Sequence, residues 1–447
     1  MEVLTLGFGL LLPWLVGVLW LVFAESRLRQ NSDINRYRQI GLGFFIGYAV
    51  LHLAVIASYQ LTGAVHWPGL MVMLLVLAVT GGIASWRSHS STVAIRSSLP
   101  VQSSTLMKGL TVLLLTLTAI HVIFMAVEVF TQPVYPWDAW LVWVYRAKAW
   151  FLSGGMVDIA HPTDWAVATT ADTYTIAAWN YPLFASVIPY WAALSLGYWS
   201  ETLVNLPVLL AGLAIGLALY GQCREFRMSI PVSIIACYLL YSIPFFGTHV
   251  ALAGYADIWM AGFTGLGFVL IIAGLIKQAD SGSLDFQIVL GFLMVGFGIL
   301  VKNEGLAWLV AALVLLAVVT WKPRTVFLTA VAIAGLVTTF YLLGIEHVNI
   351  PFVGILGYTD GRIVIPFVGA FVLEPHNVLD AYWINLFTLG SWNLMWVMVA
   401  ASILLSFRLL FMTGDVSSTH RESLVGFGFM IIFLATQWFI FGFTNQG

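Results

Sequence analysis

A short segment of the chain carries an aspartate, two cations and several tryptophans in a spacing that suits chemistry at a membrane surface. Pro136 and Asp138 favour the start of a helix, with the Asp138 carboxylate at or near the N-cap, where it meets the positive end of the helix dipole. A helix from there would bring Arg146 about two turns below Asp138. It would turn three tryptophans broadly towards the membrane: Trp140, Trp143 and Trp150.

This combination of side chains can support a transfer reaction between a hydroxyl group and a phosphate-bearing substrate. A carboxylate such as that of Asp138 can take a proton from an acceptor hydroxyl. Cations such as Arg146 and Lys148 can hold a phosphate group. The structural alternative is that Asp138 only caps an aromatic anchor helix, and this segment by itself does not decide between the two.

Three further short motifs place polar side chains between apolar stretches. Asn180, Tyr181 and Pro182 would start another helix, and helix capping alone can explain them. The motif Gly254–Asp257 lies at a turn, where Asp257 could cap the next helix. The motif Lys302–Gly305 lies at another turn and joins a cation to an anion, for which a surface ion pair of small energetic value is the structural alternative.

The elements that hold these motifs are predicted to be membrane-spanning helices. Hydrophobic residues make up 61% of the 447 residues, charged residues only 9%, and the mean hydropathy is +0.96, so no soluble domain could bury this apolar surface. Stretches of about 20 apolar residues predict an all-α polytopic membrane protein with about twelve spans. We place them at about 4–24, 41–59, 68–86, 109–130, 203–221, 230–248, 257–276, 287–301, 306–321, 326–344, 386–407 and 424–443.

The basic residues orient these spans, because the cytoplasmic loops of membrane proteins are rich in Lys and Arg. With the N-terminus outside, the cytoplasmic loops hold 14 of the 18 Lys and Arg residues. Four cations remain outside: Arg146, Lys148, Lys302 and Arg362. Residues 183–197 are too short for a span, and counting them as one would put Arg224 and Arg227 outside, so we expect them to lie at the outer interface or to re-enter.

This topology gives the outer face two long loops, residues 131–202 and 345–385. The net charge of −2 and the pI near 6.5 do not suggest a nucleic-acid partner, so membrane lipid is the partner that composition demands. Cys223 and Cys237 are poorly placed for a disulfide or a metal cluster. They therefore do not indicate whether the protein lies in an oxidising or a reducing compartment.

The four motifs together resemble the bacterial membrane glycosyltransferases of the GT-C superfamily, relatives of the protein O-mannosyltransferases and of the aminoarabinose transferase of lipid A. The resemblance covers about residues 110–345. It rests on WDAW with a downstream lysine (Trp137 to Lys148), NYP (Asn180 to Pro182), GYAD (Gly254 to Asp257) and KNEG (Lys302 to Gly305), in this order. It divides the chain into N-terminal spans (1–108), a catalytic transmembrane core (109–345) and a C-terminal part with an outer loop (346–447).

The resemblance implies a GT-C-like fold with juxtamembrane helices in the first outer loop, and an integral protein of the bacterial inner (plasma) membrane whose active site faces the periplasm or the exterior. It implies that a sugar leaves a polyprenyl-phosphate donor, usually with inversion, for a lipid, glycan or protein acceptor. Asp138 is then the essential acid. The expected substrate-binding residues are Trp137, Trp140, Arg146, Lys148, Asn180, Tyr181, Tyr255, Asp257, Lys302, Asn303 and Glu304.

Within this scheme the donor phosphate would meet Lys302, with Arg146 or Lys148 as further cations, while Asp138 activates the acceptor hydroxyl. Asp257 and Glu304 would bind sugar hydroxyls or orient Lys302. The mannosyltransferase pattern has an adjacent pair of acids at the start of the loop, whereas this chain has a single Asp138 there. The sequence therefore does not decide whether the reaction uses a divalent metal, and no other cofactor is expected.

Two other classes of protein stay open. A secondary transporter or flippase also carries polar residues within its spans, and His121 and Glu128, seven residues apart on one helix face, would be its proton-relay candidates. A degenerate relative could act as a structural partner in envelope assembly. The clustering of polar motifs at one membrane face and the lack of a convincing internal repeat favour the glycosyltransferase.

Overall fold

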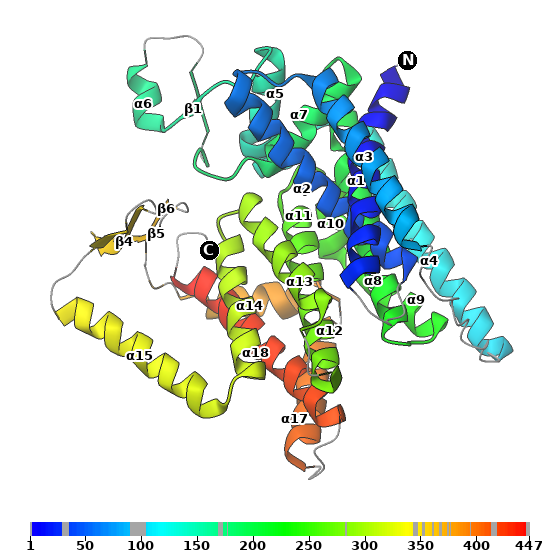
Figure 1. Ribbon diagram of the computed structural model, residues 1–447, viewed down its shortest axis with the longest axis vertical. Helices are drawn as coiled ribbons and strands as arrows, with labels where there is room; N and C mark the ends of the chain where they lie inside the picture. The colour runs from blue at the N-terminus through cyan, green and yellow to red at the C-terminus, as the bar shows by residue number, and fades with distance from the viewer. Residues whose placement is uncertain are drawn as a thin grey trace. The chain divides into compact units, whose positions relative to one another are not determined.

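The structure is a computed structural model in which helices account for nearly all of the regular structure (Figure 1). It describes residues 2–28, 35–89, 104–168, 173–176, 178–281, 284–342, 347–350, 354–359, 362–365, 369–372, 375, 377–393, 395–412 and 418–443. Apolar helices dominate this part of the chain, which confirms the prediction of a helical membrane protein. The GT-C-like arrangement of those helices stays a prediction.

The chain folds into two compact units, the first of Met1–Gly267 with Leu300–Lys302 and the second of Phe268–Ile299 with Asn303–Gly447. The first unit contains α1 (Glu2–Leu28), α2 (Arg36–Thr62), α3 (Trp67–His89), α4 (Thr105–Thr131), η1 (Ala139–Trp143), α5 (Val144–Leu152), β1 (Ile159–Ala160), α6 (Pro162–Val167), β2 (Tyr174–Thr175), α7 (Phe184–Leu196), η2 (Leu203–Asn205), α8 (Leu206–Glu225), α9 (Ile230–Tyr241), α10 (Pro244–Ala251), α11 (Asp257–Met260) and η3 (Ala261–Gly265). The segments 1–108, 109–345 and 346–447 divide the chain by expected role instead of by packing, and they stay a prediction.

Glycines let α1 and α2 pack with their backbones almost in contact. A Cβ atom on Gly17 would lie 1.9 Å from the carbonyl oxygen of Gly43, and one on Gly47 would lie 1.8 Å from that of Pro13. Lipid cannot drive two apolar helices together by the hydrophobic effect, so small residues that allow close van der Waals packing mark helix contacts in membranes. These glycines therefore fix α1 against α2.

A buried ionic cluster joins the ends of α1, α2 and α8 that we assign to the cytoplasmic side. Arg38 pairs with Glu25, and its Nε lies 2.7 Å from Oε1 of Glu225, with all three side chains almost fully buried. Gln39 donates to Glu25 (2.9 Å), and the backbone N–H of Asn35 donates to Glu225 (3.0 Å). Buried charges persist only when they are paired, so the cluster holds the three helices in one register.

Helix α7 covers residues 183–197 of the first outer loop almost completely and has 13 residues. At 1.5 Å per residue this is roughly 20 Å, less than the roughly 30 Å of a bilayer core. Nearly all of its side chains are buried in the first unit: Trp191 donates to the carbonyl of Gly9 on α1 (2.8 Å), and Trp67 on α3 donates to Ser195 (3.0 Å). The helix is thus a short packed element, and its expected place at the outer interface or as a re-entrant segment stays a prediction.

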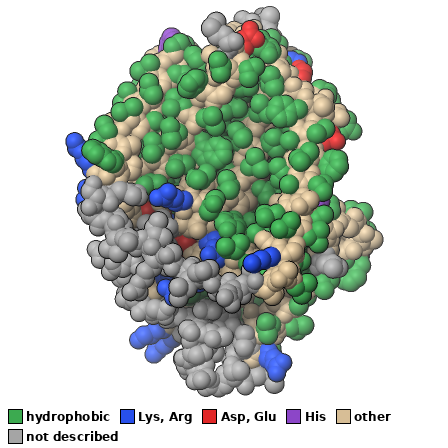
Figure 2. All heavy atoms as spheres, turned by 90° about the vertical axis from the view of Figure 1, so that its right-hand side faces the viewer, with side chains coloured by type: hydrophobic (Ala, Val, Ile, Leu, Met, Phe, Trp, Pro, Cys, Tyr) green, Lys and Arg blue, Asp and Glu red, His purple; other side chains and the backbone are tan. Residues whose placement is uncertain are grey.

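Seven of the described helices are long and apolar enough to cross a membrane, or up to eight if α9 and α10, bent by 65°, form one broken span. Exposed hydrophobic side chains are frequent on α1, α3 and α4, and Figure 2 shows such side chains over much of one face. The remaining predicted spans fall on helices of 12 to 20 residues in the second unit, so the count of twelve stays a prediction.

The second unit contains a small sheet that the sequence did not lead us to expect. The elements of the second unit are α12 (Leu266–Ser281, beginning in the first unit), α13 (Phe286–Phe297), η4 (Gly298–Leu300), α14 (Gly305–Thr320), α15 (Pro323–Leu342), β3 (His347–Ile350), β4 (Gly354–Thr359), β5 (Arg362–Ile365), β6 (Gly369–Val372), α16 (Leu379–Trp383), η5 (Ile384–Thr388), α17 (Met395–Met412) and α18 (Ser418–Phe443). Strands β3 to β6 pair antiparallel in sequence order. The expected outer loop 345–385 thus contains a four-stranded meander, built from short runs of β-branched residues separated by glycines.

Candidate active site

Asp138 lies where the chain turns from α4 into a π-helical segment. Trp137 and Asp138 form the first helical residues, and the π-helical turn η1 follows directly. The Asp138 side chain is partly exposed and makes no capping hydrogen bond to that turn. Among the described residues, this carboxylate makes no hydrogen bond and no ion pair. Capping therefore does not explain Asp138, and π-helical turns are frequent at functional sites.

The GYAD turn packs against the residues that follow Asp138. Gly254 has a φ of +110°, and a Cβ atom there would lie 2.6 Å from the Cβ of Ala139. Only glycine accepts both this backbone conformation and this approach. The close contact brings Tyr255 to the start of the Asp138 helix, although more than a hundred residues of chain separate the two motifs.

Tyr255 lies near two carboxylates, those of Asp138 and Asp257. Burial raises the pKa of the Tyr255 phenol, and the negative charges of Asp138 and then Asp257 raise it further. The phenol therefore stays protonated in neutral solution and can donate a hydrogen bond. Its ring packs on His249 at 5.0 Å between centroids, and Nδ1 of His249 lies 2.8 Å from the carbonyl oxygen of Phe245.

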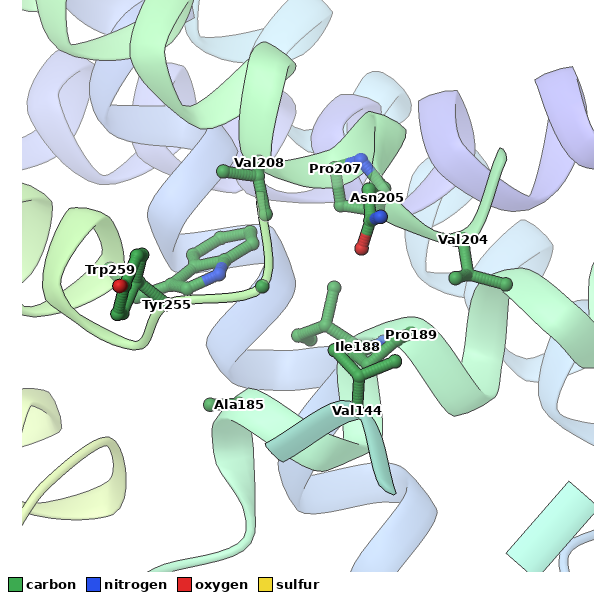
Figure 3. A pocket seen from close by; sticks show the side chains of 11 residues that line it. Val144, Ala185, Ile188, Pro189, Val204, Asn205, Pro207, Val208, Tyr255 and Trp259 are labelled. Carbon is green, nitrogen blue, oxygen red and sulfur yellow. The ribbon is translucent and has the colours of Figure 1, made fainter. Parts of the chain in front are cut away.

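A small cavity of about 10 Å³ lies behind this turn, with room for about one water molecule. Figure 3 shows Tyr255 and Trp259 on one side of it, and Ala185, Ile188 and Pro189 of α7 below. Asn205 is the main polar side chain of its lining, and it donates to the carbonyl of Glu201 (3.0 Å). Helix α7 and the GYAD turn thus border the same cavity.

Lys302 pairs with Asp257, which joins the KNEG motif to the GYAD motif. Its Nζ lies 2.8 Å from Oδ1 of Asp257, and the two side chains are 15% and 40% exposed. Asp257 is the first residue of α11 and accepts this bond instead of capping the helix. Asn303 is buried and Glu304 directly precedes α14, both in the second compact unit, and their expected part in substrate binding stays a prediction.

Arg146 is fully buried and holds the NYP motif in place. Its Nη1 donates to the carbonyl of Tyr181 (3.1 Å), and its Nη2 donates to the carbonyls of Ala178 (3.3 Å) and Trp179 (3.1 Å). Burial lowers the pKa of the guanidinium to about 10, so it stays charged near neutral pH. Arg146 is therefore a positioning residue, and the expected role in phosphate binding does not fit its surroundings.

The NYP motif itself does not start a helix. Asn180 is exposed, and α7 begins at Phe184 with Leu183 at its N-cap. The Tyr181 ring packs edge-on against Trp143 at 5.2 Å. The motif thus forms the turn before α7, and its backbone carbonyls are what Arg146 binds.

The tryptophans of the Asp138 helix do not share one face, which corrects our expectation. Trp137 and Trp140 are 67% and 46% exposed and pack edge-on at 5.6 Å. Trp143 and Trp150 are buried, and Trp150 donates to the carbonyl of Val157 (3.1 Å). A π-helical turn holds one more residue than an α-helical turn, so it rotates every later side chain relative to a regular helix.

A cleft of about 650 Å³ lies beside this helix. Lys148 lines it and pairs with Glu201 (2.5 Å), with the two side chains 43% and 39% exposed. No role was predicted from the sequence for Glu201, Tyr135, Tyr145 or His249. No short motif marks Tyr135, Tyr145 and Glu201, because the connection between α4 and α8 brings them to one cleft only after folding.

The cluster therefore consists of Asp138, Tyr255, Asp257 and Lys302. It combines a carboxylate able to accept a proton, a protonated phenol and a cation. Among the described residues, no three His, Cys, Asp or Glu side chains are grouped so that they could hold a metal ion, and no step proposed below uses one.

The transporter candidates His121 and Glu128 lie on α4, seventeen and ten residues before Asp138. Glu128 is exposed there, and the His121 ring packs against Tyr238 of α9 at 6.3 Å.

Comparison of the chain with protein-family models, with curated proteins and with solved structures gave no match.

Proposed function

We propose that this protein is a membrane glycosyltransferase of the GT-C type, which transfers a sugar from a polyprenyl-phosphate donor to an acceptor hydroxyl at the extracytoplasmic face of a bacterial inner membrane. The observation that carries the proposal is the unpaired Asp138 carboxylate beside Tyr255 and the Lys302–Asp257 ion pair. Three motifs that lie far apart in the sequence supply these groups, and one compact unit contains them all.

The chemistry follows from the ordinary reactivity of these groups. Asp138 takes the proton from the acceptor hydroxyl, and the acceptor oxygen forms a bond to the anomeric carbon of the sugar. The bond between that carbon and the phosphate oxygen breaks, and its electron pair leaves with the polyprenyl phosphate. Attack from the side opposite the leaving group inverts the anomeric configuration.

Lys302 is the cation best placed to stabilise the charge that develops on the leaving phosphate. It is the less exposed partner of its ion pair, and low local polarity strengthens such contacts. Asp257 orients the Lys302 ammonium. The protonated Tyr255 phenol can donate a hydrogen bond to the sugar or to a phosphate oxygen.

The first test replaces Asp138 by asparagine in protein reconstituted in lipid nanodiscs. Losing a general base costs typically about 10²- to 10⁴-fold in rate, so Asp138→Asn should reduce kcat by at least about 100-fold with little effect on folding, because Asp138 caps nothing. The measurement is transfer of radiolabelled sugar from polyprenyl phosphate to an envelope acceptor fraction.

The matched control for this test is Asp164→Asn, which removes an exposed acid of the same outer loop, on α6. It should keep wild-type turnover. Wild-type turnover by folded Asp138→Asn would remove Asp138 from the catalytic role. A wild-type protein that transfers no sugar but moves a lipid or solute across liposomes would instead favour the transporter.

A further inference from the structure

The cleft beside the Asp138 helix is large enough for a small ligand. Its volume of about 650 Å³ falls within the range of about 300–1,000 Å³ that ligand pockets occupy. The start of the first outer loop, η1, α5 and the segment before α8 supply its lining. The lining residues are Pro133, Val134, Tyr135, Trp140, Val144, Tyr145, Lys148 and Glu201.

Three aromatic rings of this cleft stay open to solvent. Tyr135 is 68% exposed, Trp140 46% and Tyr145 38%. Such rings present a flat apolar face and a polar edge. A sugar ring is complementary to them, because its C–H groups form an apolar face while its hydroxyls lie around the edge.

An ion pair gives the same cleft its hydrogen-bonding groups. Lys148 Nζ and Trp199 Nε1 both donate to Oε1 of Glu201, at 2.5 and 3.0 Å. Oε2 of Glu201 accepts no hydrogen bond from the described residues, and both charged side chains are partly exposed. The carboxylate is thus held in place by two donors while one of its oxygens remains open to a hydroxyl group, and the ammonium can donate further hydrogen bonds.

We propose that this cleft binds a saccharide portion of the acceptor, an inference that rests on the glycosyltransferase function proposed above. Trp140 follows Asp138 by two residues and Tyr135 precedes it by three, so the segment that carries the proposed base also supplies two of the rings that line the cleft. A prenyl chain would not need a charged pair in its groove, since charges beside a lipid tail are costly. An aromatic belt at the membrane surface would explain the rings alone and not the fixed carboxylate.

Binding of free sugars tests the cleft without any turnover. The protein is placed in phosphatidylcholine nanodiscs, because alkyl-glycoside detergents carry sugar headgroups that would compete. Saturation-transfer NMR titrations then follow cellobiose, lactose, mannobiose and chitobiose. The two test variants are Trp140→Leu, which removes a stacking face, and Glu201→Gln, which keeps the side-chain shape but removes the charge. The control is Trp321→Leu, which removes a 47% exposed tryptophan outside the cleft.

At least one disaccharide should bind the wild type and the Trp321→Leu control equally. Its affinity should fall by about tenfold in Trp140→Leu and in Glu201→Gln, as expected for loss of one aromatic or charged contact. Absence of binding to the wild type, or equal binding by all four proteins, would overturn the proposal. Because no donor is present, failure of sugar transfer would leave this result intact, and failure of binding would leave the transfer assay intact.

Discussion

The charged side chains of the first compact unit differ in how they are partnered. Lys148 and Lys302 each pair with a carboxylate, and Arg146 donates to backbone carbonyls. Asp138 has no such partner among the described residues. A carboxylate that is left unpaired can change its protonation state without breaking a structural contact, which is what a general base requires.

Replacing Lys302 tests whether its ammonium serves the donor phosphate. Lys302→Ala should lower kcat/KM for the polyprenyl-phosphate donor by about 100-fold or more, the usual cost of removing one group that stabilises a developing negative charge. Asp257→Asn should lower it less, because the lysine keeps its charge and loses only its orientation. Radiolabelled sugar transfer at a series of donor concentrations measures both variants.

Arg362→Ala is the control for the loss of a cation, since Arg362 is exposed at the start of β5 in the loop that we assign to the outer face. Its donor kinetics should equal those of the wild type. If Lys302→Ala matched this control, Lys302 would be only a structural partner of Asp257. If Asp257→Asn lost more activity than Lys302→Ala, Asp257 would have a role of its own.

At the scale of elements, Arg146 connects α5 to the turn before α7. Its three carbonyl partners come from a stretch of four residues, 178–181. Arg146→Met should lower the free energy of unfolding by at least about 2 kcal/mol, since it removes three hydrogen bonds from a buried charged donor and one such bond contributes about 1.5–3 kcal/mol. Unfolding in SDS, followed by tryptophan fluorescence, measures this loss.

Lys148→Met, two residues further along α5, is the matched control. It breaks an ion pair that is about half exposed, and such pairs contribute roughly 0–1 kcal/mol. Equal stability of Arg146→Met and the wild type would show that the NYP turn does not depend on Arg146.

The helices were largely predictable from the sequence, because long apolar stretches bounded by charged residues leave few alternatives in a membrane. The π-helical turn η1 was not, since nothing in the local sequence around Ala139 distinguishes it from an α-helical turn. That turn explains why Trp143 and Trp150 are buried instead of facing lipid. The sheet of β3 to β6 was missed because each of its strands has only four to six residues.

The candidate site was predictable in its residues but not in their partners. The order of motifs indicated Asp138, Tyr255, Asp257 and Lys302, and the structure brings these four together. From the sequence, either Asp257 or Glu304 could orient Lys302, and the structure shows the ion pair between Lys302 and Asp257. Pairing between distant residues depends on how helices pack, which local sequence patterns do not encode.

At the scale of the whole molecule, the proposed function requires the start of α5 and the GYAD turn to face outwards. That orientation depends on α7 not crossing the membrane, because one more span would invert every later loop. The loop between α8 and α9 gives the clearest test, since Arg224 and Arg227 flank it and Met228 is exposed there. We predict that Met228 faces the cytoplasm.

Cysteine labelling in intact cells decides this point. With Cys223 and Cys237 replaced by alanine, Leu61→Cys at the outer end of α2 should react with a membrane-impermeant maleimide, because Leu61 is 84% exposed. Met228→Cys should react only after the membrane is made permeable. Reaction of Met228→Cys in intact cells would mean that α7 spans the membrane. Lys302 would then lie on the cytoplasmic side and Asp138 outside, so their joint role in one active site would be impossible.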